Sequence, residues 1–530
     1  MVYFNLCDRN NQKGRIPPRA GGIGETMDSK ESRPACGLRP GFSNEEYIRL
    51  QSEKIRSRIA EFGGKLYMEF GGKLFDDYHA SRVLPGFLPN SKLKMLSALS
   101  SDAEIVIAIN AADIENSKYR EDLGITYDRE VMRLIDSFRR EGLYVGSVVM
   151  TRYSGQRAAD AFKRAMENAG IRVYRHYPIE NYPKDVARIV SEDGFGRNEY
   201  IETSRSLVVV TAPGPGSGKM ATCLSQLYHE HKRGTKAGYA KFETFPIWNL
   251  PLKHPVNLAY EAATADLADV NMVDPYHLDA YGKVAVNYNR DVEIFRVLDA
   301  MMTRIFGTCP YKSPTDMGVN MAGFAIYDDE AVREAARQEI IRRYFKAACA
   351  RLRSNKGSDE TRKIELLMEE AGIRETDRAV VPAARAVADR TGHPATAIRL
   401  PDGHIVTGKT TDLLGSSSAA LLNALKCIAG IPDEVNLISP DVIRPIMHLK
   451  AEHLGSRNPR MHTDELLLAL SICAVTDEYA SLAMESLAGL EGCEVHSTVI
   501  LAHADEKLFG KLGAYVTCDP VYEQKTLYHR

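Results

Sequence analysis

The sequence lacks any run of about twenty apolar residues, the length that a helix needs to cross a membrane. It also lacks the apolar N-terminal segment of a signal peptide. Its nine cysteines are scattered singly, without a CxxC pair, which is typical of free thiols in a reducing compartment. We therefore expect a cytoplasmic protein with no membrane partner.

The chain also lacks an excess of positively or negatively charged residues. The chain has 68 Lys and Arg residues against 70 Asp and Glu residues, which gives a formal net charge of -2. A near-neutral total argues against nucleic acid as the main partner, although it leaves room for a local basic site. With 530 residues, the chain is too long for one hydrophobic core, and we expect two to four domains.

Several catalytic and metal-binding motifs are absent. The sequence has no HExxH, no GxSxG and no zinc-deaminase signature, so it gives no support for a zinc hydrolase, a serine hydrolase or a deaminase. His229 and His231 are two residues apart on a predicted helix, so they cannot face one metal ion from the same side. We therefore expect no metal site made by the protein.

The sequence pattern divides the chain into four segments. Residues 1–40 are rich in Gly, Pro, Arg and Ser and have no periodicity, so we predict a disordered extension. Residues 41–325 alternate apolar runs with helical patterns, and residues 326–392 are predicted to form a helical connector. Residues 393–530 are predicted to form a second, mixed α/β domain.

The first large domain has the pattern of an α/β fold. Apolar runs at residues 104–110, 143–151 and 171–177 alternate with helical patterns. Strands that alternate with helices indicate βαβ units, so we predict a doubly wound, mostly parallel sheet. Two stretches with many polar or glycine residues, 76–87 and 313–324, are predicted to be loops.

A glycine-rich turn follows a predicted central strand and precedes a predicted helix. It contains Gly214, Gly216, Ser217, Gly218 and Lys219. In a P-loop-like turn of this kind, backbone N–H groups and the positive end of a helix dipole converge, and the lysine adds a full charge. We therefore predict that this turn binds phosphate.

Two residues depart from the usual P-loop pattern. Pro213 stands where the first glycine belongs, and Met220 replaces the hydroxyl residue that binds Mg²⁺. Thr222 remains as a nearby hydroxyl that would help to place the metal ion. These departures weaken the case for metal-assisted phosphoryl transfer more than the case for phosphate binding. The alternative is a turn that packs its helix onto the sheet and needs no ligand.

Residues 403–410 match the letters of the P-loop motif better. However, the β-branched residues Ile405 and Val406 indicate a strand, which cannot form a compact turn of inward-pointing N–H groups. The preceding Pro401 and Asp402 are turn residues. We therefore interpret this segment as a hairpin strand rather than as a phosphate site.

Two further residues join Lys219 as candidates for catalysis. Asp274 ends a short apolar run, as the Mg²⁺-binding aspartate of P-loop enzymes does, but it also precedes Pro275 as a helix cap would. Arg290 can contact a phosphate group or the substrate, or pair with a carboxylate at the start of a helix. Both alternatives stay open at this point.

These features together predict a nucleotide- or phosphate-dependent enzyme that catalyses phosphoryl transfer. The glycines and Ser217 of the turn would hold phosphates, and Lys219 would neutralise developing charge. The expected cofactor is ATP or another nucleotide with Mg²⁺, and the expected partner is a small phosphorylated molecule. The alternative is a non-catalytic ligand-binding protein or homo-oligomeric scaffold. A dinucleotide oxidoreductase is disfavoured, because GPGSGK does not have the GxGxxG spacing.

Long runs of the sequence resemble a known family. The runs FGGKLFDDYHASRVLPGF, VVVTAPGPGSGKMATCLSQLYHEHKRG and GCEVHSTVIL resemble the bacterial family named domain of unknown function 1846, and the resemblance covers residues 41–520. It implies a bacterial cytosolic protein with an N-terminal α/β domain, a helical middle and a C-terminal domain similar in topology to cytidine deaminases. It implies no particular activity, and because the zinc ligands of deaminases are missing, deamination is not expected.

Overall fold

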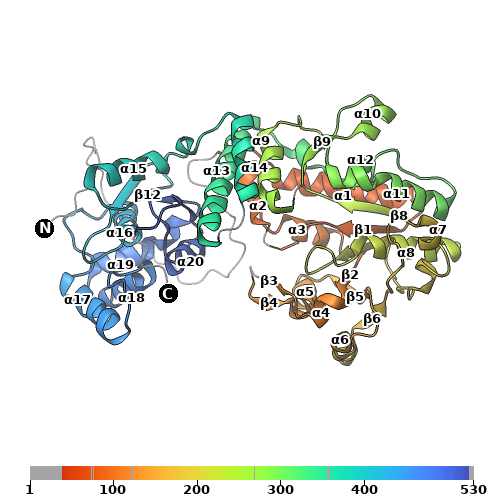
Figure 1. The fold of residues 1–530 in the computed structure, drawn as a ribbon, viewed down its shortest axis with the longest axis horizontal. Helices are drawn as coiled ribbons and strands as arrows, with labels where there is room; N and C mark the ends of the chain where they lie inside the picture. The colour runs from red at the N-terminus through yellow and green to blue at the C-terminus, as the bar shows by residue number, and fades with distance from the viewer. Residues whose placement is uncertain are drawn as a thin grey trace.

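The structure is a computed structural model that describes residues 39–72, 74–75, 77–120, 123–267, 269–354 and 358–523. The predicted disordered extension lies outside the described residues, apart from its last two positions. Figure 1 shows an N-terminal body and a C-terminal body side by side, with the long helix α13 (Asp329–Ser354) at their junction.

The N-terminal body is built on one sheet of seven strands in the order β11-β8-β1-β7-β2-β5-β6. Every neighbouring pair runs parallel, so the predicted parallel sheet is confirmed. The strands are β1 (Leu66–Phe70), β2 (Ala103–Asn110), β5 (Tyr144–Thr151), β6 (Arg172–Arg175), β7 (Leu207–Thr211), β8 (Gly238–Phe242) and β11 (Gly318–Val319). As predicted, the strand before the glycine turn, β7, is central.

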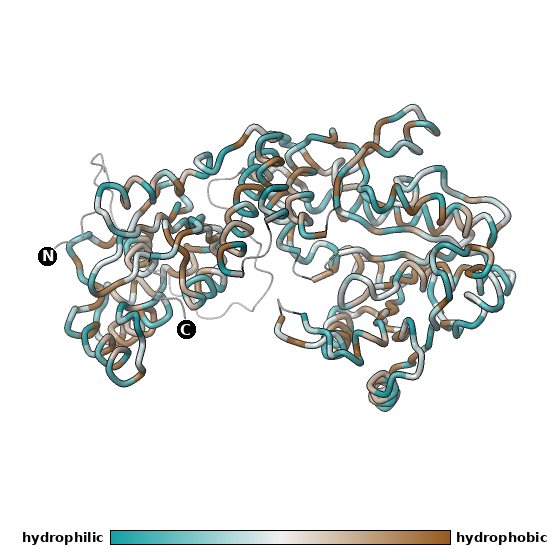
Figure 2. Tube along the Cα trace, viewed as in Figure 1, coloured by the Kyte–Doolittle hydropathy of each residue, from teal (hydrophilic) through white to brown (hydrophobic). Residues whose placement is uncertain are grey.

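Helices cover both faces of this sheet. On one face, Met68 of β1 belongs to a core that includes Ile55, and on the other face Tyr67 belongs to a core that includes Leu224. Hydrophobic and hydrophilic stretches alternate along the covering helices (Figure 2), as expected for helices with one buried side. Burial on both faces explains why β2 and β7 read as continuous apolar runs.

The helices of the N-terminal body are interspersed with its strands along the chain. They are α1 (Asn44–Glu61), α2 (Tyr78–Val83), α3 (Ser91–Ala98), α4 (Ala111–Glu115), α5 (Tyr127–Arg140), α6 (Arg157–Asn168), α7 (Val186–Ile189), α8 (Lys219–Lys232), α9 (Pro255–Ala263), α10 (Pro275–Tyr281), α11 (Asn289–Phe306), α12 (Pro314–Met317) and α14 (Ser358–Ala371). Two small antiparallel pairs lie outside the main sheet: β3 (Tyr119–Arg120) with β4 (Ile125–Thr126), and β9 (Asn271–Val273) with β10 (Val286–Tyr288).

Two predicted loops contain regular structure, so these predictions were wrong. The described part of residues 76–87 contains α2, whose capping residue Asp77 accepts a hydrogen bond from the backbone N–H of Ala80. Ala80 and Val83 are buried at helical spacing, a signal that the surrounding polar residues hid. Residues 313–324 contain α12 and β11. The two-residue strand β11 exists because β8 offers it a partner, which local sequence does not reveal.

The C-terminal body has a mixed sheet in the order β13-β12-β14-β15. Its strands are β12 (Ala395–Arg399), β13 (Ile405–Lys409), β14 (Glu494–Ser497) and β15 (Tyr515–Cys518), of which only β14 and β15 pair in parallel. Its helices are α15 (Val380–Thr391), α16 (Ser416–Ala429), α17 (Pro440–His448), α18 (Thr463–Cys473), α19 (Glu478–Glu485) and α20 (His503–Lys511). The predicted hairpin is confirmed as β12 and β13.

The helical middle region is shared between the two bodies. Ile340 of α13 and Ile364 of α14 belong to the core of the N-terminal body, whereas Val380 of α15 packs with Ala397 of β12. Helix α13 therefore belongs to the core of the N-terminal body and extends to the edge of the C-terminal body. None of the helices in the described ranges combines the length and the apolar character that a membrane span requires.

Candidate functional site

The glycine turn connects β7 to α8 and is held by internal hydrogen bonds. Gly216 has a φ of 76° and Gly218, the residue that caps α8, has a φ of 86°, a region that favours glycine. The buried hydroxyl of Ser217 donates to the carbonyl oxygen of Gly214 over 2.8 Å, and the hydroxyl of Thr151 donates to the carbonyl oxygen of Ser217 over 2.8 Å. The turn therefore has one well-defined shape.

A cavity of about 440 Å³ lies against this turn. It is located at the carboxyl ends of β1 and β7, which are neighbours in the sheet. From β1 the chain continues to β2, and from β7 it continues to β8, so the two connections run in opposite directions across the sheet. Ligands of open α/β sheets bind at such a point of reversal. The cavity is lined by Phe70, Gly72, Leu74, Phe75, Tyr119, Arg120, Tyr127, Arg133, Leu134, Thr211, Ala212, Pro213, Gly214, Pro215 and Lys219.

The charged groups of this lining are all cations within the described residues: Lys219, Arg120 and Arg133. Both arginines contact the buried carboxylate of Glu130, and the distance from Arg133 Nε to Glu130 Oε2 is 2.7 Å. In the part of the chain that the structure describes, the side chain of Lys219 makes no hydrogen bond or ion pair. The cavity wall therefore has a positive charge that a bound anion would neutralise.

The predicted phosphate-binding residues play different parts in this geometry. Gly214 and Lys219 line the cavity. Ser217 uses its hydroxyl inside the turn, so it stabilises the turn rather than offering that proton to a ligand. Thr222 is fully buried on α8, and its hydroxyl oxygen has no hydrogen-bond partner among the described residues. Gly216 and Gly218 supply the backbone shape.

The structure does not bring Asp274 to this cavity. Strand β9, which precedes it, pairs only with β10 and is not part of the parallel sheet. The buried carboxylate of Asp274 caps α10 by accepting hydrogen bonds from the backbone of Tyr276 and His277. It also accepts a hydrogen bond of 2.6 Å from the hydroxyl of Thr315. These contacts match the alternative of a helix cap.

Arg290 is likewise engaged away from the glycine turn. Its guanidinium pairs with Asp269 through two contacts, Nε to Oδ1 at 2.6 Å and Nη2 to Oδ2 at 2.7 Å. Asp269 is buried, so this bidentate pair ties the first turn of α11 to the loop before β9. The arrangement matches the alternative of an ion pair at a helix start.

A buried charged cluster at the carboxyl end of β8 was missed by the sequence reasoning. Lys241 contacts the carboxylates of Asp291 and Glu243, the latter at 2.7 Å, and also the hydroxyl of Tyr288. Burial raises the pKa of Glu243 to about 7, against the opposing effect of Lys241. A carboxyl group that titrates near neutral pH can act as a general acid or base. The sequence signal was a lysine near the end of an apolar strand and a glutamate directly after that strand.

This cluster and the cavity at the glycine turn lie at the same edge of the sheet but on opposite faces. Tyr239, two positions before Lys241 on β8, packs with Leu224 of α8, whereas Phe70 of the cavity lining belongs to the core on the other face. Lys241 lies opposite Glu69 in the register of β8 and β1. Both Glu69 and Lys219 act on the thiol of Cys223 in α8: burial raises the pKa of this thiol well above its usual range, Glu69 raises it further, and Lys219 opposes the shift. The α8 side of the sheet therefore carries Lys241 and Glu69, whereas the cavity lies on the α5 side.

Residues 403–410, which match the letters of the P-loop motif better, contain a β-strand. Residues 405–409 form β13, which pairs antiparallel with β12 from Ala395 to Arg399. The interpretation as a hairpin strand is confirmed. No cluster of three or more His, Cys, Asp or Glu side chains suited to a metal ion occurs in the described ranges.

The sequence matches a family along nearly its whole length. Residues 40–372 match Domain of unknown function DUF1846, N-terminal, and residues 376–528 match Domain of unknown function DUF1846, C-terminal. The chain is 57% identical over 489 residues to the UPF0371 protein str1377 of Streptococcus thermophilus (strain CNRZ 1066), covering 92% of this chain and 99% of the relative. The same identity and coverage hold for the UPF0371 protein of Streptococcus pneumoniae serotype 19F (strain G54). The chain therefore belongs to the DUF1846 family, as the resemblance predicted.

Proposed function

We propose that the cavity at the glycine turn binds the phosphate group of a nucleotide or another small phosphorylated molecule, and that the protein is an enzyme acting on this ligand. The observation that carries the proposal is the position of Lys219: it lines the cavity at the start of α8 and has no anionic partner among the described residues. A phosphate at this point would meet the lysine, the helix N-terminus and the backbone of the turn together.

The rest of the cavity suits an organic phosphate. Arg120 and Arg133 add positive charge to the lining, and Tyr119, which also lines the cavity, is 56% exposed. An exposed aromatic ring can stack on a base or a sugar face. The volume of about 440 Å³ lies within the range of small-molecule sites.

The catalytic part of the proposal uses the cluster around Lys241, which lies at the same edge of the sheet as the cavity but on its α8 face. Glu243 would accept or donate a proton near neutral pH, because burial holds its pKa near 7. Phosphoryl transfer is the reaction that these groups suit best, with Lys219 neutralising the charge that develops on the transferred group. No carboxylate lines the cavity among the described residues, so the lysine and arginines support anion binding more directly than Mg²⁺ binding.

The binding claim is tested by calorimetry with ATP, ADP and a sugar phosphate, each with and without Mg²⁺. We expect Lys219→Ala to weaken binding of the best ligand by at least about tenfold, as for the loss of one charge-assisted contact. Lys219→Arg should keep part of the affinity. The matched control is Lys232→Ala, which removes a lysine from the other end of α8, where it pairs with Glu192.

Two results would count against the proposal. If none of these ligands binds, or if Lys219→Ala binds as tightly as the wild type, the turn only packs α8 onto the sheet. The enzymatic claim is followed separately by ³¹P NMR of the ligand during incubation. A ligand that binds but stays unchanged with every acceptor tested would favour the ligand-binding scaffold.

A further inference from the structure

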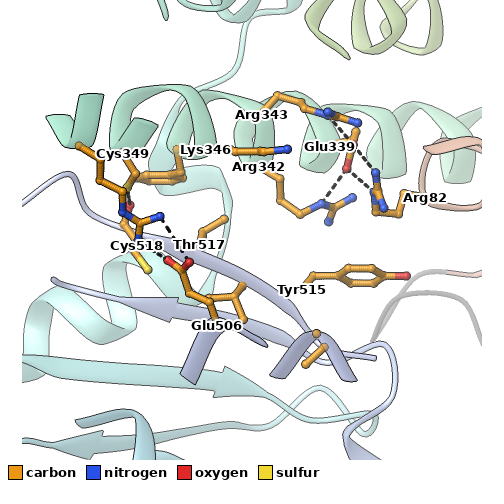
Figure 3. A pocket seen from close by; sticks show the side chains of 15 residues that line it. Arg82, Glu339, Arg342, Arg343, Lys346, Cys349, Glu506, Tyr515, Thr517 and Cys518 are labelled. Atoms are coloured by element: carbon orange, nitrogen blue, oxygen red, sulfur yellow. Dashed lines mark hydrogen bonds and ion pairs between the residues drawn. The ribbon is translucent and has the colours of Figure 1, made fainter. Parts of the chain in front are cut away.

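A second cavity, of about 420 Å³, lies between the two bodies of the protein. One wall is α13 together with Arg82 of α2, and the other wall is formed by β15 and α20 of the C-terminal body. Figure 3 shows Arg82, Arg342 and Arg343 gathered around Glu339, with Lys346 on the same helix as Glu339, α13. Any molecule bound here would therefore contact both bodies.

One buried carboxylate serves three guanidinium groups in this cavity. Arg82, Arg342 and Arg343 each place Nε 2.9 Å from an oxygen of Glu339 (Figure 3). Burial by itself raises the pKa of Glu339, but the three arginines together lower it well below its usual range, so this carboxylate is ionised. Its single negative charge can balance only one of the three positive charges, and of the other two only Arg342 also reaches a second carboxylate in the described ranges, that of Glu494.

Arg342 has an unsatisfied donor in the cavity. Only 8% of this residue is exposed, and its Nη1 atom donates to Glu494 over 3.2 Å. Its Nη2 atom is buried and has no hydrogen-bond partner among the described residues. Buried guanidinium donors are normally satisfied, so an unpaired one indicates a missing acceptor.

The surrounding groups do not supply that acceptor. Glu494 is shared with the fully buried Arg378, whose Nη1 atom lies 2.7 Å away. Lys346 adds a further positive charge with no ion pair in the described part of the chain, and burial together with Arg343 and Arg82 lowers its pKa. Glu506 at the far end is engaged with Arg353 at 2.6 Å.

The balance of positive and negative charge distinguishes two explanations of this cluster, a structural network between the two bodies and a binding site for an anion. A purely structural network between two bodies would be balanced, because an unmatched buried charge destabilises the contact. Here the cavity lining has five cations, Arg82, Arg342, Arg343, Lys346 and Arg353, against two carboxylates, Glu339 and Glu506, and the buried pair of Arg378 with Glu494 behind it adds one charge of each sign. The arrangement lacks negative charge, and planar guanidinium groups are suited to phosphate oxygens.

The thiols in the cavity do not offer a nucleophile. Cys349 and Cys518 are buried, and burial raises the pKa of Cys349 to about 12. Both thiols stay protonated at neutral pH and act as apolar wall, together with Phe345 and Val516. The cavity thus combines a cationic end with an apolar side.

We propose that this interdomain cavity is a binding site for a phosphorylated organic molecule, distinct from the site at the glycine turn. The phosphate would accept hydrogen bonds from Arg342 and its neighbours, and the organic part would lie against the apolar wall. Because α2 and α13 belong to one body and β15 to the other, the ligand would hold the two bodies together.

The test uses the full chain carrying Lys219→Ala, so that binding at the glycine turn is weakened and contributes less to the signal. Pyrophosphate and fructose 1,6-bisphosphate are titrated by calorimetry into this protein and into versions that also carry Lys346→Glu or Lys507→Glu. Lys507 is exposed on α20 and lies outside the cavity lining, so its reversal matches the charge change without touching the site.

We expect both probes to bind, the organic one more tightly, and Lys346→Glu to weaken them by at least about tenfold. Lys507→Glu should leave the affinity unchanged. The site is disproved if neither probe binds, or if the two charge reversals have the same effect. Binding of pyrophosphate alone would overturn the assignment of an organic ligand.

Discussion

The hydroxyl of Tyr127 occupies the space beside Gly214 in which a side chain would lie: a Cβ added to Gly214 would come within 2.3 Å of that oxygen. Tyr127 also lines the cavity at the glycine turn. The glycine is therefore required by a close approach between α5 and the turn, and its own φ is not in the left-handed region.

Gly214→Ala should destabilise the protein by about 1–3 kcal/mol through overpacking and should weaken phosphate binding at the turn. Urea unfolding measures the first effect and calorimetry the second. The destabilisation should be smaller in a Tyr127→Ala background, because the clashing atoms are gone. Gly216→Ala is the control, since no atom lies near its added Cβ and its cost comes from a φ of +76°. Equal losses for Gly214→Ala in both backgrounds would contradict the steric explanation.

Glu243 should make stability depend on pH below neutrality. Burial raises its pKa in the folded protein to about 7 from a usual value of 4.5, so between these values the folded state binds more protons than the unfolded state. Its contribution is complete below about pH 4.5 and is lost as pH rises toward 7, at about 1.4 kcal/mol per pH unit.

Urea unfolding at several pH values tests this effect. Glu243→Gln should flatten the profile between pH 4.5 and 7, whereas Glu45→Gln, at an exposed position of α1, should not. An unchanged profile in Glu243→Gln would show that this carboxyl group does not titrate in that window.

Asp274→Ala separates a structural role from a catalytic one. Its carboxylate caps α10 and binds Thr315, so we expect a loss of about 2 kcal/mol or more in the free energy of unfolding. Ligand affinity at the glycine turn should stay the same with and without Mg²⁺. A selective loss of Mg²⁺-dependent binding, with stability intact, would restore Asp274 as a metal ligand.

Lys346→Glu should stabilise the ligand-free protein. It replaces a cation beside Arg343 with an anion in a cavity that has too little negative charge, so the melting temperature should rise by about 1–3 °C at low salt. The gain should shrink at high salt, because ions screen the repulsion that it relieves. Lys507→Glu should give no gain. A lower melting temperature for Lys346→Glu would mean that the cluster is already balanced.

Local features of this protein were readable from its sequence. The strand, turn and helix around Lys219 were predicted correctly, because a buried parallel strand, a run of glycines and a helix start each depend on neighbouring residues. The start of α1 is likewise a local feature, since the hydroxyl of Ser43 accepts a hydrogen bond from the backbone N–H of Glu46 three residues away.

The tertiary structure alone decided what surrounds these features. Tyr127 and Arg120 reach the glycine turn only because α5 and the β3–β4 hairpin pack over the end of β7, and Lys241 meets Asp291 only because α11 starts beside β8. The cationic interdomain cavity requires α13 to lie against β15. Such contacts depend on strand order and packing between distant segments, and no local pattern encodes them. The sequence determined that a glycine-rich turn joins a buried strand to a helix, and the packing of distant elements placed a cavity and its positive charge beside it.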